Sequence, residues 1–228
     1  MKVREQATYE KILLREQQLY LLPEKTIYWK EKNFLILTDL HLGKAGHFRK
    51  AGIPIPTQVH TADLDCLRQL IFNFSPVKVL MLGDLFHSDI NTEWNDFRAL
   101  LMQFPEVEFV LVKGNHDILP EEAYAESNLK VIPEFMECAP FYFSHHPDES
   151  THPAGLYKLA GHVHPGYKVN FGNGQSIKLP CFFFGKTGGL LPAFGKFTGC
   201  VHVPARHHDQ VFAVLHAGHE NARVMRVH

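Results

Sequence analysis

The sequence has few cysteines and no long apolar run, and both absences exclude classes of protein. Its cysteines are Cys66, Cys138, Cys181 and Cys200, and no two of them form a C-x-x-C pair. This spacing excludes a disulfide-rich scaffold and a cysteine-based zinc site. No stretch of about 18 apolar residues occurs, which excludes a membrane-spanning helix. The charged N-terminal stretch lacks the apolar core of a secretion signal. We therefore expect a protein of the reducing cytoplasm with no membrane partner.

An excess of charge of one sign is also lacking. Lys and Arg number 23 against 24 Asp and Glu, which gives a formal net charge of -1. This balance argues against attraction of nucleic acid by the whole surface, although a small basic patch would still serve an enzyme that acts on nucleic-acid ends. The length of 228 residues and the hydrophobic fraction of 45% predict one globular domain over residues 1–228.

The hydrophobic pattern predicts an α/β fold. Apolar runs that predict strands lie at 19–22, 26–29, 34–37, 77–82, 107–112, 140–143, 156–160, 168–171, 181–184, 210–215 and 222–227. Apolar residues spaced by three or four predict helices after Thr57 and after Asn91. Strands and helices alternate in the first half, which favours parallel strands with helical crossovers. After about residue 135 the strands follow closely, so we expect an antiparallel second sheet packed on the first, with the helices outside.

Polar clusters follow several of these apolar runs where each run ends. They read TDLH at 38–41, GDLFH at 83–87, GNHD at 114–117, SHHP at 144–147 and GHVH at 161–164. Ligands bind at the carboxyl ends of strands in α/β sheets. Glycines at 83, 114 and 161 allow sharp turns there. Each cluster alone is common in proteins, whereas all of them in this order predict one site.

The ligand atoms in these clusters are oxygen and nitrogen, with no thiolate. They belong to Asp39, His41, Asp84, Asn115, His145, His162 and His164. Such a set suits Mn²⁺, Fe or Zn²⁺ in a catalytic site. Asp39 and His41 alternate with a leucine, so an extended chain would point both the same way. His162 and His164 alternate with a valine in the same manner. Two metals about 3.5–4 Å apart could share all these ligands if one carboxylate bridged them.

The ordered set D-x-H, G-D-x-x-H, G-N-H-D, H-H-P and G-H-x-H resembles the calcineurin-like metallophosphoesterase superfamily, from Asp39 to His164. The stretches TDLHLGKAGHFRKAGIPIP at 38–56, GDLFHS at 83–88 and LLPAFGKFTG at 190–199 are similar to a bacterial branch, the ligase-associated DNA damage response endonucleases. The superfamily resemblance implies two packed mixed β-sheets flanked by α-helices, an αββα sandwich. The branch resemblance implies a cytoplasmic bacterial protein with a functional link to an ATP-dependent DNA ligase and a helicase.

The superfamily resemblance also implies which residues hold two divalent metal ions, with Mn²⁺ favoured over Fe or Zn²⁺. Residues that would hold the first ion are Asp39, His41 and His164. Residues that would hold the second are Asn115, His145 and His162, with Asp84 bridging the two ions. Asn115 alone also suits an ordinary turn, because Gly-Asn is common in turns.

Two further pairs of residues are expected near the metals. His116 directly follows Asn115, so we expect it to act as general acid on the leaving oxygen or to stabilise the charge that builds on phosphorus. Asp117 is expected to orient the His116 ring and raise its pKa, or to cap the helical turn that follows. His145 and His146 alternate along a strand, so only one is expected to face the site. The superfamily pattern favours His145 as the ligand and leaves His146 to support a ligand or contact the substrate.

Three residues are expected at the edge of the site. Lys44 and Arg49 follow the first ligand pair, where they would contact phosphates beside the scissile one or lie on a solvated loop face. His87 resembles the superfamily position that hydrogen-bonds a ligand, or it only caps a loop.

These expectations together predict a metal-dependent enzyme that hydrolyses phosphodiesters, in DNA by resemblance to the branch. A phosphoprotein phosphatase, a nucleotide pyrophosphatase and a cyclic-nucleotide phosphodiesterase are the alternatives, because metal ligands alone do not select the ester. An inactive binding scaffold of the same fold is disfavoured, since the ligands and His116 are all present.

Overall fold

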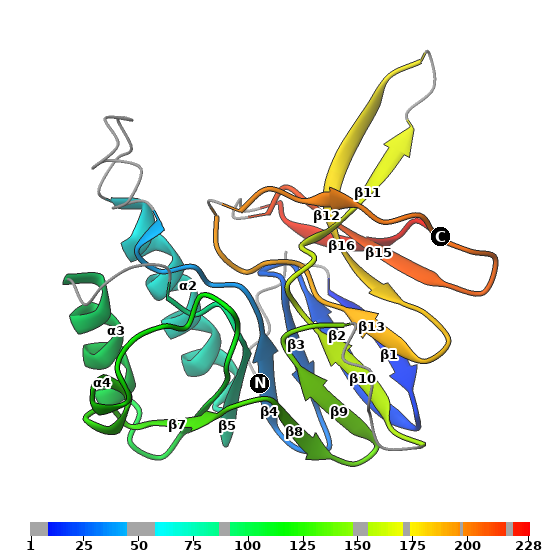
Figure 1. Ribbon diagram of the computed structural model, residues 1–228. Coiled ribbons are helices and arrows are strands. Elements are labelled where there is room, and N and C mark those ends of the chain that lie inside the picture. The colour runs from blue at the N-terminus through cyan, green and yellow to red at the C-terminus, as the bar shows by residue number, and fades with distance from the viewer. Residues whose placement is uncertain are drawn as a thin grey trace.

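The structure is a computed structural model in which two β-sheets face each other and the described helices cover one of them (Figure 1). It describes residues 9–44, 58–86, 92–147, 155–170, 174–196, 198–217 and 221–228. The helices are α2 (Gln58–Phe74), α3 (Thr92–Met102) and α4 (Glu121–Ala125). The first two confirm the helices predicted after Thr57 and after Asn91.

The first sheet has seven strands in the order of the chain. They are β1 (Glu10–Leu14), β2 (Gln17–Leu22), β3 (Thr26–Trp29), β4 (Phe34–Leu37), β5 (Lys78–Leu82), β6 (Glu108–Val112) and β7 (Leu129–Ile132). Strands β1 to β4 pair antiparallel, and β4 to β7 pair parallel. The predicted parallel strands with helical crossovers are therefore confirmed. Their carboxyl ends meet at one edge of the sheet.

The second sheet has nine strands, in the order β14-β11-β12-β13-β10-β9-β8, with β15 beside β12 and β16 beside β15. They are β8 (Phe135–Cys138), β9 (Phe141–Ser144), β10 (Tyr157–Ala160), β11 (Pro165–Asn170), β12 (Ser176–Phe184), β13 (Gly188–Leu190), β14 (Val201–His202), β15 (Gln210–Leu215) and β16 (Arg223–Arg226). As the resemblance implied, this sheet is mixed.

The expectation that the second sheet is wholly antiparallel is wrong. Strand β10 pairs parallel with both β9 and β13. The connection of residues 145–156 is long enough to return the chain to the starting end of the sheet, which a parallel pair requires. Between β10 and β13, strands β11 and β12 bring the chain back to the end of the sheet where β10 starts. As a result, the carboxyl ends of β9 and β10 lie at one edge.

Apolar residues fill the space on both sides of the first sheet. Trp29 packs against Phe141 between the two sheets, with ring centroids 4.8 Å apart. On the other face, Trp94 and Phe97 of α3 join the core under the helices. The central strands are therefore buried on both faces, as parallel strands usually are. Among the described residues, no helix has the length and apolarity to cross a bilayer.

Candidate metal centre

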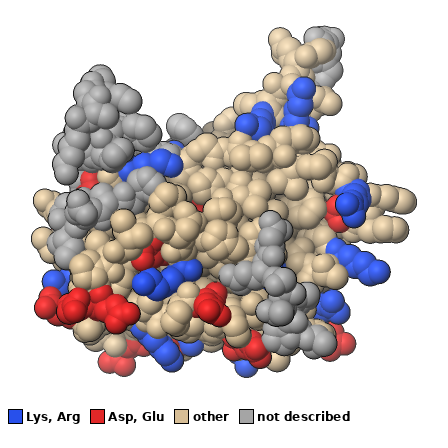
Figure 2. All heavy atoms as spheres, viewed as in Figure 1, with Lys and Arg blue, Asp and Glu red and all other residues tan. Residues whose placement is uncertain are grey.

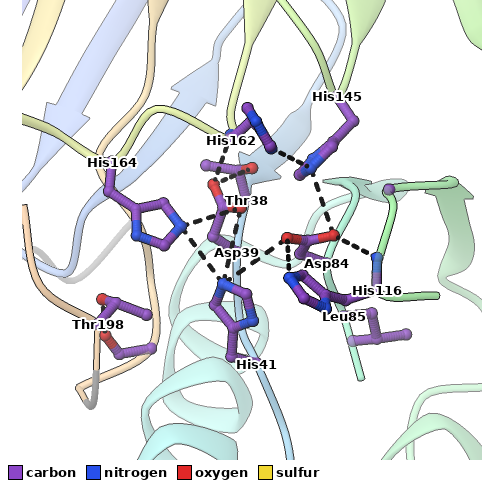
Figure 3. Close-up of polar contacts among 12 residues, drawn as sticks. Thr38, Asp39, His41, Asp84, Leu85, His116, His145, His162, His164 and Thr198 are labelled. Carbon is purple, nitrogen blue, oxygen red and sulfur yellow. Dashed lines mark hydrogen bonds and ion pairs between the residues drawn. The ribbon is translucent and has the colours of Figure 1, made fainter. Parts of the chain in front are cut away.

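The predicted ligands converge where the carboxyl ends of the two sheets meet (Figure 3). Asp39 and His41 follow β4, and Asp84 follows β5 of the first sheet. His145 follows β9, and His162 and His164 follow β10 of the second sheet. Neither sheet alone holds the whole set, so the site depends on the packing of one sheet on the other.

The first ligand group comprises Asp39, His41 and His164, whose ligand atoms lie within 4.8 Å of one another. The Nε2 atoms of the two histidines are 3.3 Å apart. Asp39 Oδ1 lies 3.3 Å from His164 Nε2 and 3.9 Å from His41 Nε2. This is the set that the superfamily resemblance assigned to the first metal ion.

The carboxylate of Asp39 is held so that one oxygen faces this group. Its Oδ2 accepts a hydrogen bond from the backbone amide of His162 at 3.0 Å and lies 2.7 Å from the Thr38 hydroxyl. The Thr38 hydroxyl also lies 2.8 Å from the carbonyl oxygen of Leu82. Sequence reasoning missed Thr38, although a hydroxyl beside a predicted ligand at the end of a buried strand was a usable signal.

The second ligand group is built around His145. In the neutral ring, its Nδ1–H donates a hydrogen bond to the carbonyl oxygen of Leu82 at 2.9 Å. The unprotonated Nε2 then faces Asn115 Oδ1 at 3.2 Å and His162 Nδ1 at 3.1 Å. A backbone carbonyl that fixes the tautomer in this way prepares an imidazole for metal binding. The structure thus brings together the set that the superfamily resemblance assigned to the second ion.

Asp84 lies between the two groups. Its Oδ1 is 3.3 Å from His145 Nε2, and its Oδ2 is 3.8 Å from His41 Nε2. Burial raises the pKa of Asp84, but the hydrogen bond and charge of His145, the backbone amide of His116 and the charge of His41 together hold it well below its usual range. Asp84 is therefore ionised and placed to bridge.

The pKa values of the histidines in the two groups shift in different directions. Burial lowers the pKa of His41 to about 4 against the opposing charges of Asp39 and Asp84, so its imidazole is neutral. Burial also lowers the pKa of His162. For His145, burial acts in the same direction, but Asp84 outweighs it and raises the pKa. A neutral imidazole is the form that binds a metal.

The backbone of the ligands departs from the extended conformation assumed for the two alternating pairs. Positive φ angles occur at Asp39 (53°), His41 (49°), Asp84 (51°), His162 (67°) and His164 (50°). Strand alternation therefore does not describe these residues, even though Asp39 and His41 do share one group. His162 and His164 approach different groups, which an extended chain would not allow. Left-handed backbone at non-glycine residues costs about 1–2 kcal/mol each and is concentrated at functional sites.

Glycines next to Asp84 and Asn115 leave the space that the ligands occupy. A Cβ on Gly83, whose φ is 78°, would overlap the His145 ring. A Cβ on Gly114 would overlap Asp84 Oδ1 and lie 3.0 Å from His145 Nε2. Gly83 supplies the predicted turn, whereas Gly114 serves close packing.

His116 lies over the ligand cluster and is more open to solvent. Its side chain is 42% exposed, and its Nε2 is 4.0 Å from Asp84 Oδ2. The His41 side chain, by contrast, is 4% exposed. His116 is therefore placed to meet a molecule that enters from solvent.

Asp117 makes contacts that differ from the predicted one with the His116 ring. Its Oδ1 accepts hydrogen bonds from the amides of Leu85 and Phe86, and its Oδ2 accepts one from the amide of Gly114 at 2.8 Å. Burial raises the pKa of Asp117 to about 6, against the opposing effect of these amides. Asp117 ties the loop after β5 to the loop after β6, and so positions Asp84 relative to Asn115.

His146 lies closer to the site than strand alternation predicted. Strand β9 ends at Ser144, so alternation no longer applies at His145 and His146. Both have ligand atoms within 4.8 Å of that of His162, and the His146 and His162 ring centroids are 4.2 Å apart. The structure therefore places both histidines at the site.

The residues expected at the edge of the site are only partly described. Lys44 is half-buried, and its charge helps to lower the pKa of His41. Lys44 therefore lies near the first ligand group. Arg49 and His87 lie outside the described residues.

The residues present fit a pair of divalent cations. Asp39 Oδ1 is buried and has no hydrogen-bond partner among the described residues, while imidazole nitrogens face it. Desolvating a carboxylate oxygen without a donor is costly, and a cation at that point would offset the cost. The donors are carboxylate, imidazole and amide groups, which suit Mn²⁺, Fe or Zn²⁺.

The sequence profile of calcineurin-like phosphoesterases matches residues 32–189. The chain belongs to this family. The matched range contains every predicted metal ligand, together with His116 and Asp117. The resemblance stated from the ordered motifs is thereby confirmed, and so is the family fold of packed mixed sheets.

Solved structures give a closer comparison. The Pseudomonas putida nuclease MPE is similar over 90% of this chain and 96% of that chain, with 28% identity and a TM-score of 0.75. Yfce, a phosphoesterase from E. coli, overlaps 78% of this chain and 86% of its own, with 11% identity and a TM-score of 0.45. The Aquifex aeolicus protein of unknown function AQ665 overlaps 57% and 78%, with 17% identity and a TM-score of 0.41. No curated protein matches the chain.

Proposed function

We propose that this phosphoesterase hydrolyses phosphodiester bonds in DNA at a dinuclear metal centre, with Mn²⁺ as the favoured ion. The observation that carries the proposal is the position of Asp84, whose two oxygens face the two ligand groups. Support for a nucleic-acid substrate comes from the similarity to the P. putida nuclease over nearly the whole of both chains.

The ligand residues would hold positive charge in place at the site before the substrate binds. Two divalent ions, when bound, supply an activated water and offset negative charge on the phosphoryl oxygens. Asp39, His41 and His164 would hold one ion, Asn115, His145 and His162 the other, and Asp84 both. The carbonyl of Leu82 keeps the His145 ring in the required tautomer. Because the groups are buried and held by hydrogen bonds, little reorganisation is needed during the reaction.

His116 is the proposed general acid. Its side chain combines exposure to solvent with a position 4.0 Å from the bridging carboxylate. From there its Nε2 would donate a proton to the leaving oxygen as the bond to phosphorus breaks. Asp117 would act through the backbone, by positioning the loops that carry Asp84 and His116. Lys44 and Arg49 would contact phosphates beside the scissile one. His146 and His87 would support a metal ligand or contact the substrate.

The test uses bis-p-nitrophenyl phosphate with added Mn²⁺. We expect Asp84→Asn to abolish turnover, because the bridge loses its charge, and His116→Ala to lower kcat by about 10²–10⁴. Asp65→Asn and His207→Ala change exposed residues of the same types and should leave the rate within about twofold. Full activity in both site variants would refute the mechanism.

A panel of substrates tests which class of phosphate ester the enzyme hydrolyses. Single-stranded, duplex and end-modified DNA, a phosphopeptide, a dinucleoside polyphosphate and a cyclic nucleotide would be compared with Mn²⁺, Fe²⁺ and Zn²⁺. We expect kcat/KM to be highest on DNA. Preference for the phosphopeptide or a nucleotide would assign another activity of the family, and no metal-dependent hydrolysis at all would favour a binding scaffold.

A role in bacterial DNA repair, with cleavage inside a DNA strand, completes the proposal. It rests on the branch resemblance, which also connects the chain to an ATP-dependent DNA ligase and a helicase in the cytoplasm. Cleavage of covalently closed circular DNA would support internal cleavage. Pull-down of the ligase and helicase from the source cell would test the partners.

A further inference from the structure

A β-hairpin projects from the body of the protein (Figures 1 and 2). It consists of β11 and β12, and β11 begins at Pro165, directly after His164 of the first ligand group. At its base, Pro165 and Gly166 also pair with β14. Farther out, β11 pairs with β12 as far as Asn170 and Ser176. The hairpin is therefore a ribbon with its root at the candidate metal centre.

The two faces of this ribbon differ in chemistry. Strand alternation places Tyr167 and Val169 on one face and Lys168 on the other. The register sets Lys168 directly opposite Lys178, and both are exposed. Neither lysine forms an ion pair with any acid in the described part of the chain. One face of the ribbon thus presents two adjacent ammonium groups.

The lysine-bearing face of the hairpin is the face covered by residues 198–201, and this segment flanks the first ligand group. A Cβ on Gly166 would lie 2.6 Å from Cys200 Sγ and 3.3 Å from Lys178 Cγ, so Cys200 and Lys178 cover the same face. Val201, the next residue, donates its amide to the carbonyl of His164 at 2.9 Å. Figure 3 shows Thr198 of the same segment on the His164 side of the site.

Two like charges opposite each other on a hairpin destabilise it. A bound polyanion would remove that cost. The net charge of -1 gives the protein no general attraction for nucleic acid, so any such attraction must come from local groups of this kind. Lys168 lies four residues from His164, so their Cα atoms are at most about 13 Å apart along the chain. The lysines would therefore meet phosphates beside the scissile one.

We propose that the Lys168–Lys178 face of the hairpin binds the sugar-phosphate backbone of the nucleic-acid substrate on one side of the cleaved bond. The inference rests on the proposed function and adds the surface that selects a polymer over a small ester. The contact is with phosphates, so it is expected to be independent of base sequence.

The test is the double variant Lys168→Gln/Lys178→Gln. Fluorescence anisotropy would measure its Kd for a labelled single-stranded oligonucleotide at several salt concentrations, and turnover would be measured on that oligonucleotide and on bis-p-nitrophenyl phosphate. We expect the Kd and KM for the oligonucleotide to rise roughly tenfold or more at 0.1 M salt. The salt slope should fall by about 1.4, and the rate on the small ester should stay within about twofold.

The matched control removes the same charge elsewhere. Lys186→Gln/Arg206→Gln changes exposed residues that line a cleft between the β12–β13 turn and the loop after β14, and it should leave oligonucleotide binding unchanged. An unchanged Kd in the hairpin variant, an equal loss on both substrates, or an equal loss in the control would overturn the inference. Wild-type protein that cleaves neither substrate would instead refute the proposed function.

Discussion

At the scale of single residues, Lys25 is an unusual buried charge outside the metal centre. The residue is 9% exposed, and its Nζ donates a hydrogen bond to the carbonyl of Gly195 at 3.2 Å. The Gly195 amide in turn donates to the carbonyl of Asp39. Burial lowers the pKa of Lys25 to about 8, and the charge of Asp63 opposes this only in part. Lys25 therefore ties the segment after β13 to the rim of the first sheet at a cost in stability.

Because of this cost, the free energy of unfolding is expected to depend on pH. Between pH 8 and about 10.4 the unfolded chain keeps the Lys25 proton and the folded chain loses it, so the free energy of unfolding rises with pH through this range. We expect the wild type to gain about 2 kcal/mol relative to Lys25→Met between pH 7.5 and 9.5. Urea unfolding of both proteins at the two pH values measures this difference. Parallel pH profiles would show that Lys25 ionises normally in the folded state.

The convergence of the candidate ligand residues could be predicted from the sequence, but their backbone conformation could not. The clusters ended at predicted strands, and parallel strands bring their ends to one edge, so Asp39, Asp84 and Asn115 followed from the pattern. Positive φ at His162 and His164 depends on contacts with residues far away in the chain, such as the bond from the His162 amide to Asp39. No local rule contains that contact.

At the scale of secondary-structure elements, the loops after β5 and β6 are packed too closely for a side chain at Gly114. We expect Gly114→Ala to displace the Asp84 carboxylate and lower kcat by about 10²-fold, because small displacements of reacting groups are costly. The Mn²⁺ concentration for half-maximal activity should rise as well. Both are measured with bis-p-nitrophenyl phosphate.

Gly199→Ala is the matched control, since a Cβ there meets no heavy atom within 4 Å among the described residues. It should leave activity and Mn²⁺ dependence unchanged. If Gly114→Ala keeps the wild-type metal dependence while its Tm falls, the glycine serves stability alone.

The central strands of the first sheet were predicted from long apolar runs. Strands β4, β5 and β6 are buried on both faces, so their sequences are continuous runs that need no partner to be found. The parallel pairing of β9, β10 and β13 was not predictable in this way. Strand direction depends on how connections return, and the residues between β9 and β10 carry ligands rather than a helical pattern.

At the scale of the whole molecule, each ligand group contains residues that follow strands of both sheets. His41 and His164 are 123 positions apart in the chain, and their Nε2 atoms are 3.3 Å apart. A cation held between them would join the carboxyl ends of the two sheets. Metal binding and the packing of the two halves are therefore coupled.

This coupling predicts a thermal shift. After chelation, Mn²⁺ at about 100 times its Kd should stabilise the fold by about 2.7 kcal/mol, which corresponds to roughly 5–10 °C in Tm for a chain of this length. Calorimetry with and without Mn²⁺ measures the shift. Asp39→Asn should reduce it, whereas Lys32→Gln, at an exposed position, should not. An equal shift in both variants would place the stabilising ion elsewhere.

The separation of the ligands along the chain also bears on biosynthesis. A ribosome makes Asp39 and His41 early, but His164 only after most of the polypeptide has emerged. Until then a nascent chain lacks the donors to complete either ligand group. If the enzyme hydrolyses phosphodiesters as proposed, it would thus lack its catalytic ions for most of the time that it is attached to its own messenger RNA.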